Sequence, residues 1–239
     1  MNQMVSTLSR CLRGCAVALA VIVSLPGCTR VILGTVHPVA RGAESAPIPV
    51  ADLLIEPRQF PARYRAVVLD ATAVYRALQD IDGVAAASVV NPPQCAPPPR
   101  APQDTAAVQG IDSQDASSLI VTVTRPAAPL RGRAEQLTAC PSFTAVQGHD
   151  ASAVAVTVLP APPVDADDSL AVDQTITAGS SGSMRRTLTL AAQIADLRVS
   201  ATWLHDGTKE AAPGVAPDTQ ALDALFTDAV LAVRRLGGP

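Results

Sequence analysis

The chain has 239 residues, a formal net charge of −3 at pH 7 and only 16% charged residues. Its length is sufficient for one good-sized domain with additional terminal segments. The acidic balance argues against a nucleic-acid partner, which would require a basic face, and against electrostatic binding to anionic lipid. Aromatic residues make up 3% of the chain, too few for a base-stacking or sugar-binding surface.

The first 28 residues have the pattern of a bacterial lipoprotein signal. Two arginines precede an apolar stretch over residues 15–25, and Gly27 directly precedes Cys28. As a helix this stretch would span about 16 Å, whereas the hydrocarbon core of a bilayer is about 30 Å thick. We therefore predict a signal peptide over residues 1–27, with acyl chains such as palmitate attached through Cys28. The alternative is an ordinary secretory signal that is followed by a chance cysteine.

Residues 28–48 show no apolar periodicity and contain several glycines and prolines, which predicts a flexible tether with a reach of about 25 Å. All 21 acidic residues and 16 of the 18 basic residues follow Cys28, so the mature chain carries a net charge of −5. We expect it to be lipid-anchored at the extracytoplasmic face of the cell membrane, with residues 49–239 forming a single domain.

Several elements follow from apolar spacing and from turn residues. Asp70 and Gly83 are placed to begin and end a helix over residues 72–82. The proline-rich residues 91–106 are expected to lack regular structure. A second helix is expected over residues 130–137. Strands are predicted where β-branched residues gather or apolar and polar residues alternate, namely residues 118–124, 153–159, 184–190 and 197–203.

The alternation in the last of these strands predicts one solvent-facing side. Residues 191–196 remain open between a hairpin connection and a helical turn. The strongest pattern is an unbroken apolar stripe over residues 218–236, which predicts a helix packed on a sheet and not one lying on a membrane. Together these elements predict an α+β fold, a mostly antiparallel sheet with helices on one face and a long C-terminal amphipathic helix.

The chain contains five cysteines. Cys11 and Cys15 would leave with the signal, and Cys28 would carry lipid. Cys95 and Cys140 then remain, and outside the cytoplasm they are expected to form a disulfide. A metal site is the alternative, but two thiols without a nearby histidine are a weak ligand set.

No pattern of residues predicts catalysis. His37 lies in the tether, His149 precedes an aspartate, and His205 begins a His-Asp-Gly sequence that predicts a hairpin turn. A metal shared by two of these histidines is a weaker alternative. Nucleophile-elbow, phosphate-loop and zinc-helix motifs are absent from the sequence. The aspartates at 165, 167 and 168 are expected to form a solvated loop and not a calcium site. No enzymatic activity, cofactor or metal is expected.

Three short motifs support a resemblance: Leu-Leu-Ile-Glu-Pro at residues 53–57, Asn-Pro-Pro-Gln-Cys at 91–95 and Cys-Pro-Ser-Phe at 140–143. They resemble mycobacterial lipoproteins with a domain of unknown function, a group that is in turn similar to the extracellular sensor domain of some mycobacterial serine/threonine kinases. The resemblance spans about residues 50–236 and implies an α+β domain with a ligand groove. The chain departs from the kinase sensors because it has cysteines for one disulfide only.

These observations favour a cell-envelope lipoprotein with a non-catalytic, sensor-like domain that binds a small molecule, a lipid or a protein. One alternative is a lipid carrier with an apolar cavity between the sheet and the last helix, and another is an envelope hydrolase.

Overall fold

The computed structural model describes residues 47–100, 102–179, 182–208 and 215–237. The predicted signal peptide, Cys28, His37 and nearly all of the predicted tether lie outside the described residues. Among the described residues, no helix combines the length and the apolar character needed to span a membrane.

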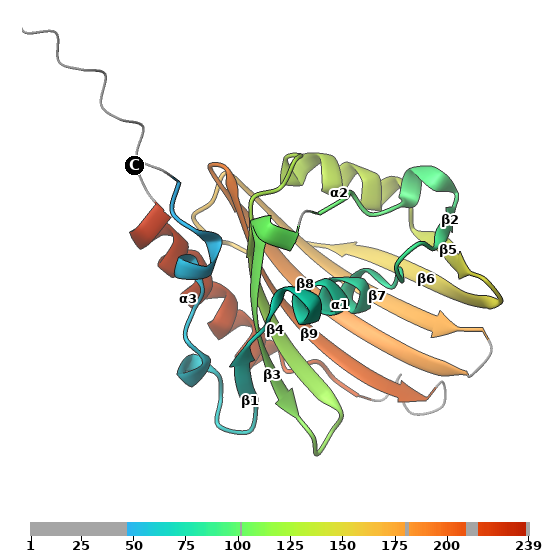
Figure 1. The fold of residues 1–239 in the computed structure, drawn as a ribbon, viewed down its shortest axis with the longest axis horizontal. Helices are drawn as coiled ribbons and strands as arrows, with labels where there is room; N and C mark the ends of the chain where they lie inside the picture. Colours follow the sequence, from blue (N-terminus) through green and yellow to red (C-terminus); the bar gives the residue numbers. More distant parts are fainter. Residues whose placement is uncertain (1–46, 101, 180–181, 209–214, 238–239) are drawn as a thin grey trace, which may run out of the picture. The chain divides into compact units, whose positions relative to one another are not determined.

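The described strands form one open antiparallel sheet of nine strands, in the order β1-β3-β4-β9-β8-β7-β6-β5-β2 (Figure 1). This confirms the predicted fold class. The strands are β1 (Arg65–Val68), β2 (Val89–Asn91), β3 (Thr105–Asp112), β4 (Ser117–Thr124), β5 (Ser142–Gln147), β6 (Asp150–Leu159), β7 (Asp168–Ala178), β8 (Ser183–Ile194) and β9 (Leu197–Thr208).

The described α-helices are α1 (Ala71–Asp82), α2 (Leu130–Ala139) and α3 (Thr219–Gly237). Short 3-10 turns occur at η1 (Val50–Leu53), η2 (Pro57–Gln59), η3 (Pro93–Cys95) and η4 (Pro102–Asp104). The segment 91–106, which was expected to lack regular structure, therefore holds two of these turns and the end of β2, and β3 begins within it. The prediction for this segment was wrong because proline is compatible with a 3-10 turn. Proline fixes φ near −65°, and this value lies within the range of a 3-10 turn.

Helix α1 begins one residue before the predicted residue 72 and ends at the predicted Asp82, and Asp70 and Gly83 cap it as expected. The Asp70 carboxylate accepts a hydrogen bond from the backbone N–H of Ala73 at 2.8 Å, and Gly83 adopts a left-handed conformation with φ of 68°. A Cβ at Gly83 would lie 2.7 Å from Cγ1 of Ile176. Glycine is thus required there both for the backbone conformation and for close packing of the helix end on β7.

The four predicted strands are confirmed as β4, β6, β8 and β9. The open question over residues 191–196 is resolved as a hairpin, because β8 continues to Ile194 and its turn lies at residues 195–196. The expected turn at His205 was wrong. Strand β9 continues through residues 205–207 because β8 is long enough to pair with them. Met184 of β8, for example, lies opposite Gly207. Across the same pair of strands, Arg185 donates to Asp206 at 2.6 Å.

Helices were expected on one face of the sheet, but they cover both faces. Helix α3 packs on β4, β8 and β9, while α1 and α2 pack on the opposite face (Figure 1). Alternation along the central strands explains this arrangement. In β4, for example, Leu119 and Val121 belong to the cluster under α3, whereas Ile120 belongs to the cluster under α1.

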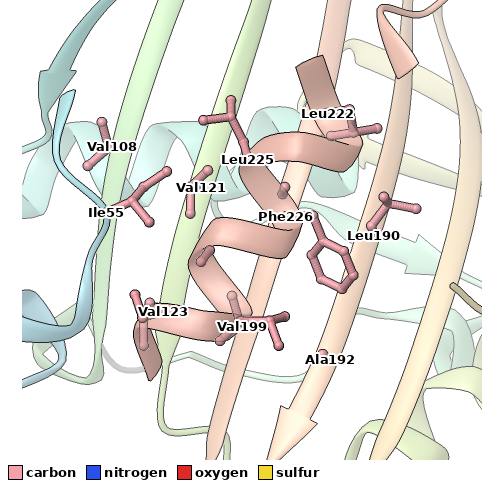
Figure 2. Packing of buried hydrophobic residues seen from close by; sticks show 14 of the residues in the cluster. Ile55, Val108, Val121, Val123, Leu190, Ala192, Val199, Leu222, Leu225 and Phe226 are labelled. Atoms are coloured by element: carbon pink, nitrogen blue, oxygen red, sulfur yellow. The ribbon is translucent and has the colours of Figure 1, made fainter. Parts of the chain in front are cut away.

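The apolar stripe of α3 forms the centre of the larger core (Figure 2). Phe226 is 1% exposed, and its neighbours Leu222 and Leu225 are equally buried. They share one cluster with Val121 of β4, Val199 of β9 and other residues of the central strands. The predicted packing of the last helix on the sheet is therefore confirmed.

We expect the substitution Phe226→Ala to destabilise the protein by about 3 to 5 kcal/mol, because it leaves a cavity that the surrounding core cannot fill. Leu231→Ala on the same helix is the matched control, since Leu231 is 49% exposed and its loss should change stability by only about 0.5 kcal/mol. Denaturant unfolding of both variants measures the difference. Equal stabilities would contradict the central role of Phe226.

Candidate anion-binding site

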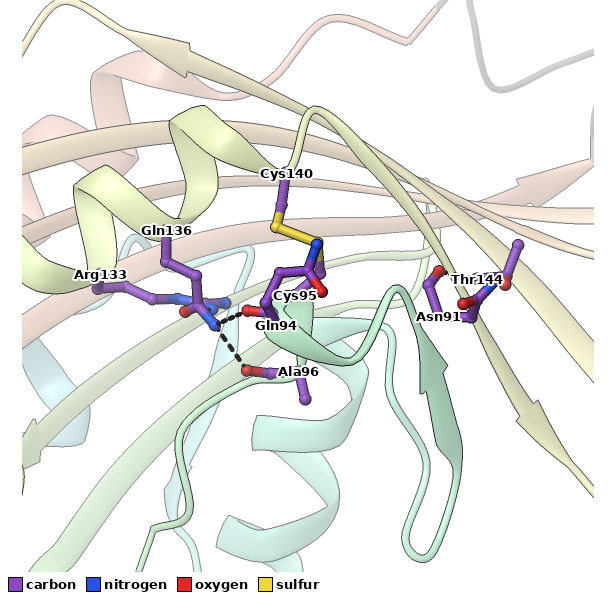
Figure 3. The surroundings of a disulfide bond; sticks show 8 residues. All are labelled: Asn91, Gln94, Cys95, Ala96, Arg133, Gln136, Cys140 and Thr144. Atoms are coloured by element: carbon purple, nitrogen blue, oxygen red, sulfur yellow. Dashed lines mark hydrogen bonds between the residues drawn. A yellow bond between two sulfur atoms is a disulfide. The ribbon is translucent and has the colours of Figure 1, made fainter.

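A disulfide holds the first part of the site in place. Cys95 in η3 and Cys140 directly after α2 are bonded, with their Cα atoms 5.7 Å apart (Figure 3). Both cysteines are 2% exposed. This confirms the predicted pair and joins the proline-rich segment to the end of α2.

Gln136 reinforces this connection from within α2. Its side-chain amide donates to the backbone carbonyls of Gln94 at 2.7 Å and Ala96 at 2.8 Å (Figure 3). Its side-chain oxygen accepts from Nη1 of Arg133 at 2.6 Å. The disulfide and Gln136 together fix α2 against the segment that leads to Arg100, and they orient Arg133 as well.

An inner chamber of about 80 Å³ lies between α1 and α2, above the central strands of the sheet. Aliphatic side chains of the two helices form its walls, among them Ile81 and Leu137. Its floor consists largely of hydroxyl side chains that are bonded across strands: Thr122 to Ser200 at 2.7 Å and Thr105 to Thr124 at 2.8 Å. A buried polar floor is unusual under packed helices, and apolar walls with a few polar groups are the usual lining of a ligand pocket.

The floor also corrects one prediction. The polar side of residues 197–203 was expected to face solvent, but Arg198 and Ser200 line the inner chamber and Thr202 is 0% exposed. Polar and apolar residues do alternate along this strand, but helices α1 and α2 cover its polar side.

Three arginines from different elements meet at this chamber. Arg100 comes from the loop after η3, Arg133 from α2 and Arg198 from β9. Asp82, the last residue of α1, accepts hydrogen bonds from both terminal nitrogens of Arg100 at 2.7 and 3.2 Å, and it lies 3.7 Å from Nη2 of Arg133. The side chains of Asp82 and Arg133 are 11% and 10% exposed. Asp82 is the only carboxylate among the described residues that line the chamber.

Burial disfavours the positive charge of two of these arginines, Arg133 and Arg198. Burial, together with repulsion from Arg100 and Arg133, lowers the pKa of Arg198 to about 10. Burial also lowers the pKa of Arg133. Arg198 nevertheless remains protonated at neutral pH. Among the described lining residues, Asp82 supplies one negative charge for three arginines, so a bound anion would stabilise the cluster.

Two side chains that line the chamber each carry a buried polar atom without a hydrogen-bond partner in the part of the chain that the structure describes. These atoms are Nε of Arg198 and the amide nitrogen Nε2 of Gln174. Gln174 is 5% exposed and lines the chamber. Buried donors are rarely left unpaired in proteins, so both are candidates to donate to a ligand.

An outer groove of about 560 Å³ adjoins the chamber and shares four lining residues with it: Arg100, Thr124, Arg133 and Arg198. The other groove residues are mainly proline and small apolar residues, with the charged exceptions Asp104 and Arg125. The arginines therefore lie at the boundary between the narrow chamber and the wider groove.

Other residues noted in the sequence lie apart from this site. The three aspartates of the 165–168 loop have separate partners: Asp165 pairs with Arg234, Asp168 with Arg131, and Asp167 accepts from the backbone N–H of Ala195. No metal-binding group of histidine, cysteine or carboxylate side chains occurs among the described residues. His149 lies in the turn between β5 and β6.

One further pair deserves comparison with a hydrolase site. Ser117 of β4 lies opposite His205 of β9, and Asp115 lies two residues before Ser117 in the chain. The Ser117 hydroxyl, however, donates to Asp115, and the residue is 1% exposed. His205 stacks on Trp203, with ring centroids 5.9 Å apart. This arrangement supports packing at the sheet end and leaves the serine inaccessible to a substrate.

Sequence reasoning did not single out any of the three arginines. A signal was present for Arg133, because it lies between Leu130 and Leu137 at helical spacing and therefore on the buried face of α2. Arg100 and Arg198 carry no comparable signal, since only the folded topology brings them together.

Comparisons with known proteins do not assign a family. No family model matches the chain, and no curated protein matches it. Among solved structures, an uncharacterized protein from Mycobacterium smegmatis is similar, with 16% sequence identity and a TM-score of 0.46 over 77% of this chain and 96% of that chain. The likeness is to an uncharacterized mycobacterial protein, and it adds nothing about activity.

We expect Cys95→Ser, made together with Cys140→Ser, to lower the stability of the protein by roughly 4 kcal/mol, because the bond closes a 45-residue separation in the unfolded chain. Denaturant unfolding of the oxidised protein and the double variant measures this loss. Thiol titration provides the control, and two titratable thiols in the oxidised wild type would contradict the pairing.

Proposed function

We propose that the chain is a cell-envelope lipoprotein, held at the extracytoplasmic face of the membrane through Cys28, whose domain binds a small organic anion. One observation carries the proposal: the inner chamber gathers three arginines around a single carboxylate, Asp82. This leaves an excess of two positive charges in a protein whose mature chain is acidic overall.

An unbalanced, partly buried cluster of this kind is unfavourable for folding alone. Removing a charge from water costs several kcal/mol, and only a well-placed partner offsets that cost. Asp82 supplies one partner for Arg100 and Arg133. Burial is the main cause of the lowered pKa of Arg198, with repulsion from Arg100 and Arg133 adding to it. Nη2 of Arg198 donates to the neutral backbone carbonyl of Ala128, which does not balance its charge. An anionic ligand would complete the set, as is common where arginines gather in a cleft.

The lining of the site favours binding over catalysis. The described residues around the chamber and the groove include neither histidine nor cysteine. The hydroxyls of Thr122 and Ser200 are bonded to each other. The motifs resemble mycobacterial lipoproteins that are in turn similar to extracellular sensor domains, and this also favours a binding role in which the domain reports the presence of its ligand.

The lipid-carrier alternative places the cavity between the sheet and α3. Side chains such as Phe226 and Trp203, each 1% exposed, fill that interface. The inner chamber and outer groove instead lie on the opposite face, where arginines make them better suited to an anion than to an acyl chain.

We expect millimolar sulfate, used as a probe anion, to raise the melting temperature more than chloride at equal ionic strength. Binding to the native state alone stabilises it by about 2.7 kcal/mol at 100 times the dissociation constant. Arg133→Gln should abolish the sulfate-specific shift. Arg131→Gln is the matched control, since it removes the same charge from the same helix at a side chain that is 73% exposed. Equal shifts in both variants would contradict the site.

The anchoring part of the proposal is tested separately. We expect Cys28→Ala to abolish incorporation of radiolabelled fatty acid into the protein, because no other residue would accept the lipid. Metabolic labelling in an actinobacterial host measures the incorporation. Equal label in the wild type and the variant would contradict anchoring without affecting the anion site.

A further inference from the structure

We infer that the anion recognised at this site is a phosphate monoester, with its phosphoryl group bound where the inner chamber meets the outer groove. The inference rests on the proposed anion-binding function and specifies its ligand. It follows from the charge of the cluster, from its free donors and from the shape of the two cavities.

The charge of the site matches a dianion. Arg100, Arg133 and Arg198 contribute three positive charges and Asp82 one negative charge. In the outer groove, Arg125 and Asp104 add one charge of each sign, so the excess among the lining residues remains two. Arg125 also pairs with Asp196, which lies outside the lining. A phosphate monoester carries about −1.5 to −2 at pH 7. A carboxylate or a phosphate diester carries a single charge and would leave one arginine uncompensated.

The available donors also favour a phosphoryl group. Arg100 already directs both terminal nitrogens to Asp82, and Arg133 directs one to Gln136. Nη2 of Arg198 donates to the backbone carbonyl of Ala128 at 2.7 Å, whereas its Nε has no partner in the described part of the chain. The remaining donors thus come from several guanidinium groups on different elements. Three phosphoryl oxygens can accept from several directions, whereas a carboxylate has two oxygens in one plane.

The cavities indicate where the rest of the ligand would lie. The inner chamber, at about 80 Å³, is too small for a typical organic ligand, whose pockets measure roughly 300 to 1,000 Å³. The outer groove has a volume of about 560 Å³ and falls within that range. Its walls, which include Pro126 and Pro129, suit an apolar organic group. The ester substituent would therefore occupy the outer groove.

The test compares three probes with the same aromatic group: phenyl phosphate, diphenyl phosphate and benzoate. Isothermal titration of the purified mature chain at pH 8 should show phenyl phosphate binding at least about tenfold more tightly than the two monoanions, since it neutralises both excess charges. Arg133→Gln should remove this preference, and the control Arg131→Gln should retain it.

The pH dependence provides a second readout. Between pH 8 and pH 5 the affinity for phenyl phosphate should fall by about tenfold, because the second ionisation of a phosphate monoester lies near pH 6. The affinity for inorganic sulfate, a dianion throughout this range, should remain nearly constant. A parallel fall for both probes would overturn the inference, because it would place the titrating group on the protein.

Asp82→Asn tests the charge argument independently of Arg133. It raises the excess from two charges to three and should strengthen phenyl phosphate binding by roughly threefold or more. Weaker binding would overturn the inference, and circular dichroism controls for folding.

The outcomes separate this inference from the proposed function. Binding of benzoate or diphenyl phosphate as tight as that of phenyl phosphate, and lost in Arg133→Gln, would overturn the phosphate inference but preserve an anion site. Arg133-independent binding of every probe would overturn both. Vesicles that contain phosphatidic acid distinguish the source of the phosphoryl group. Vesicle binding that phenyl phosphate displaces indicates a lipid headgroup, and binding of the soluble probe alone indicates a soluble metabolite.

Discussion

The packing of α3 against β4, β8 and β9 is the contact on which the rest of the fold depends. It buries a continuous apolar stripe that includes Phe226 and brings the largest cluster of aliphatic residues together with Trp203 (Figure 2). Because burial on this face supplies much of the hydrophobic stabilisation, the opposite face of the same strands need not be wholly apolar. This face has smaller apolar clusters under α1 and α2, and the larger cluster under α3 leaves room beside them for hydroxyls, arginines and a narrow chamber.

The accuracy of the sequence-based predictions follows from the strength of local patterns. Strand β4 was found because Leu-Ile-Val-Thr-Val at residues 119–123 is β-branched and buried on both sides, and α3 was found because its stripe is unbroken. Strand β3 was missed because alanine, glutamine and Gly110 dilute its pattern. Gly110 is nevertheless needed, since a Cβ there would lie 2.6 Å from Cδ1 of Phe60. The site was missed because its arginines lie far apart in the sequence and meet only through tertiary packing.

The disulfide between Cys95 and Cys140 has a role beyond restricting the unfolded chain. Together with Gln136 it holds α2 and the segment that leads to Arg100 in one arrangement (Figure 3). Two of the three arginines are thereby positioned before any ligand arrives. Fixing binding groups in advance reduces the ordering that association would otherwise require. Arg198 is held in a different way, by the ladder of the central sheet.

The first described residues lie next to this site. Nη2 of Arg125, a side chain that lines the outer groove, donates to the backbone carbonyl of Ile48 at 2.7 Å, and its Nε pairs with Asp196 at 3.0 Å. The chain therefore enters the domain beside the groove. If the protein is anchored through Cys28, the groove would stay within a short distance of the outer surface of the membrane. A ligand released at the membrane surface would reach it at a higher local concentration than one that diffuses in from outside the cell.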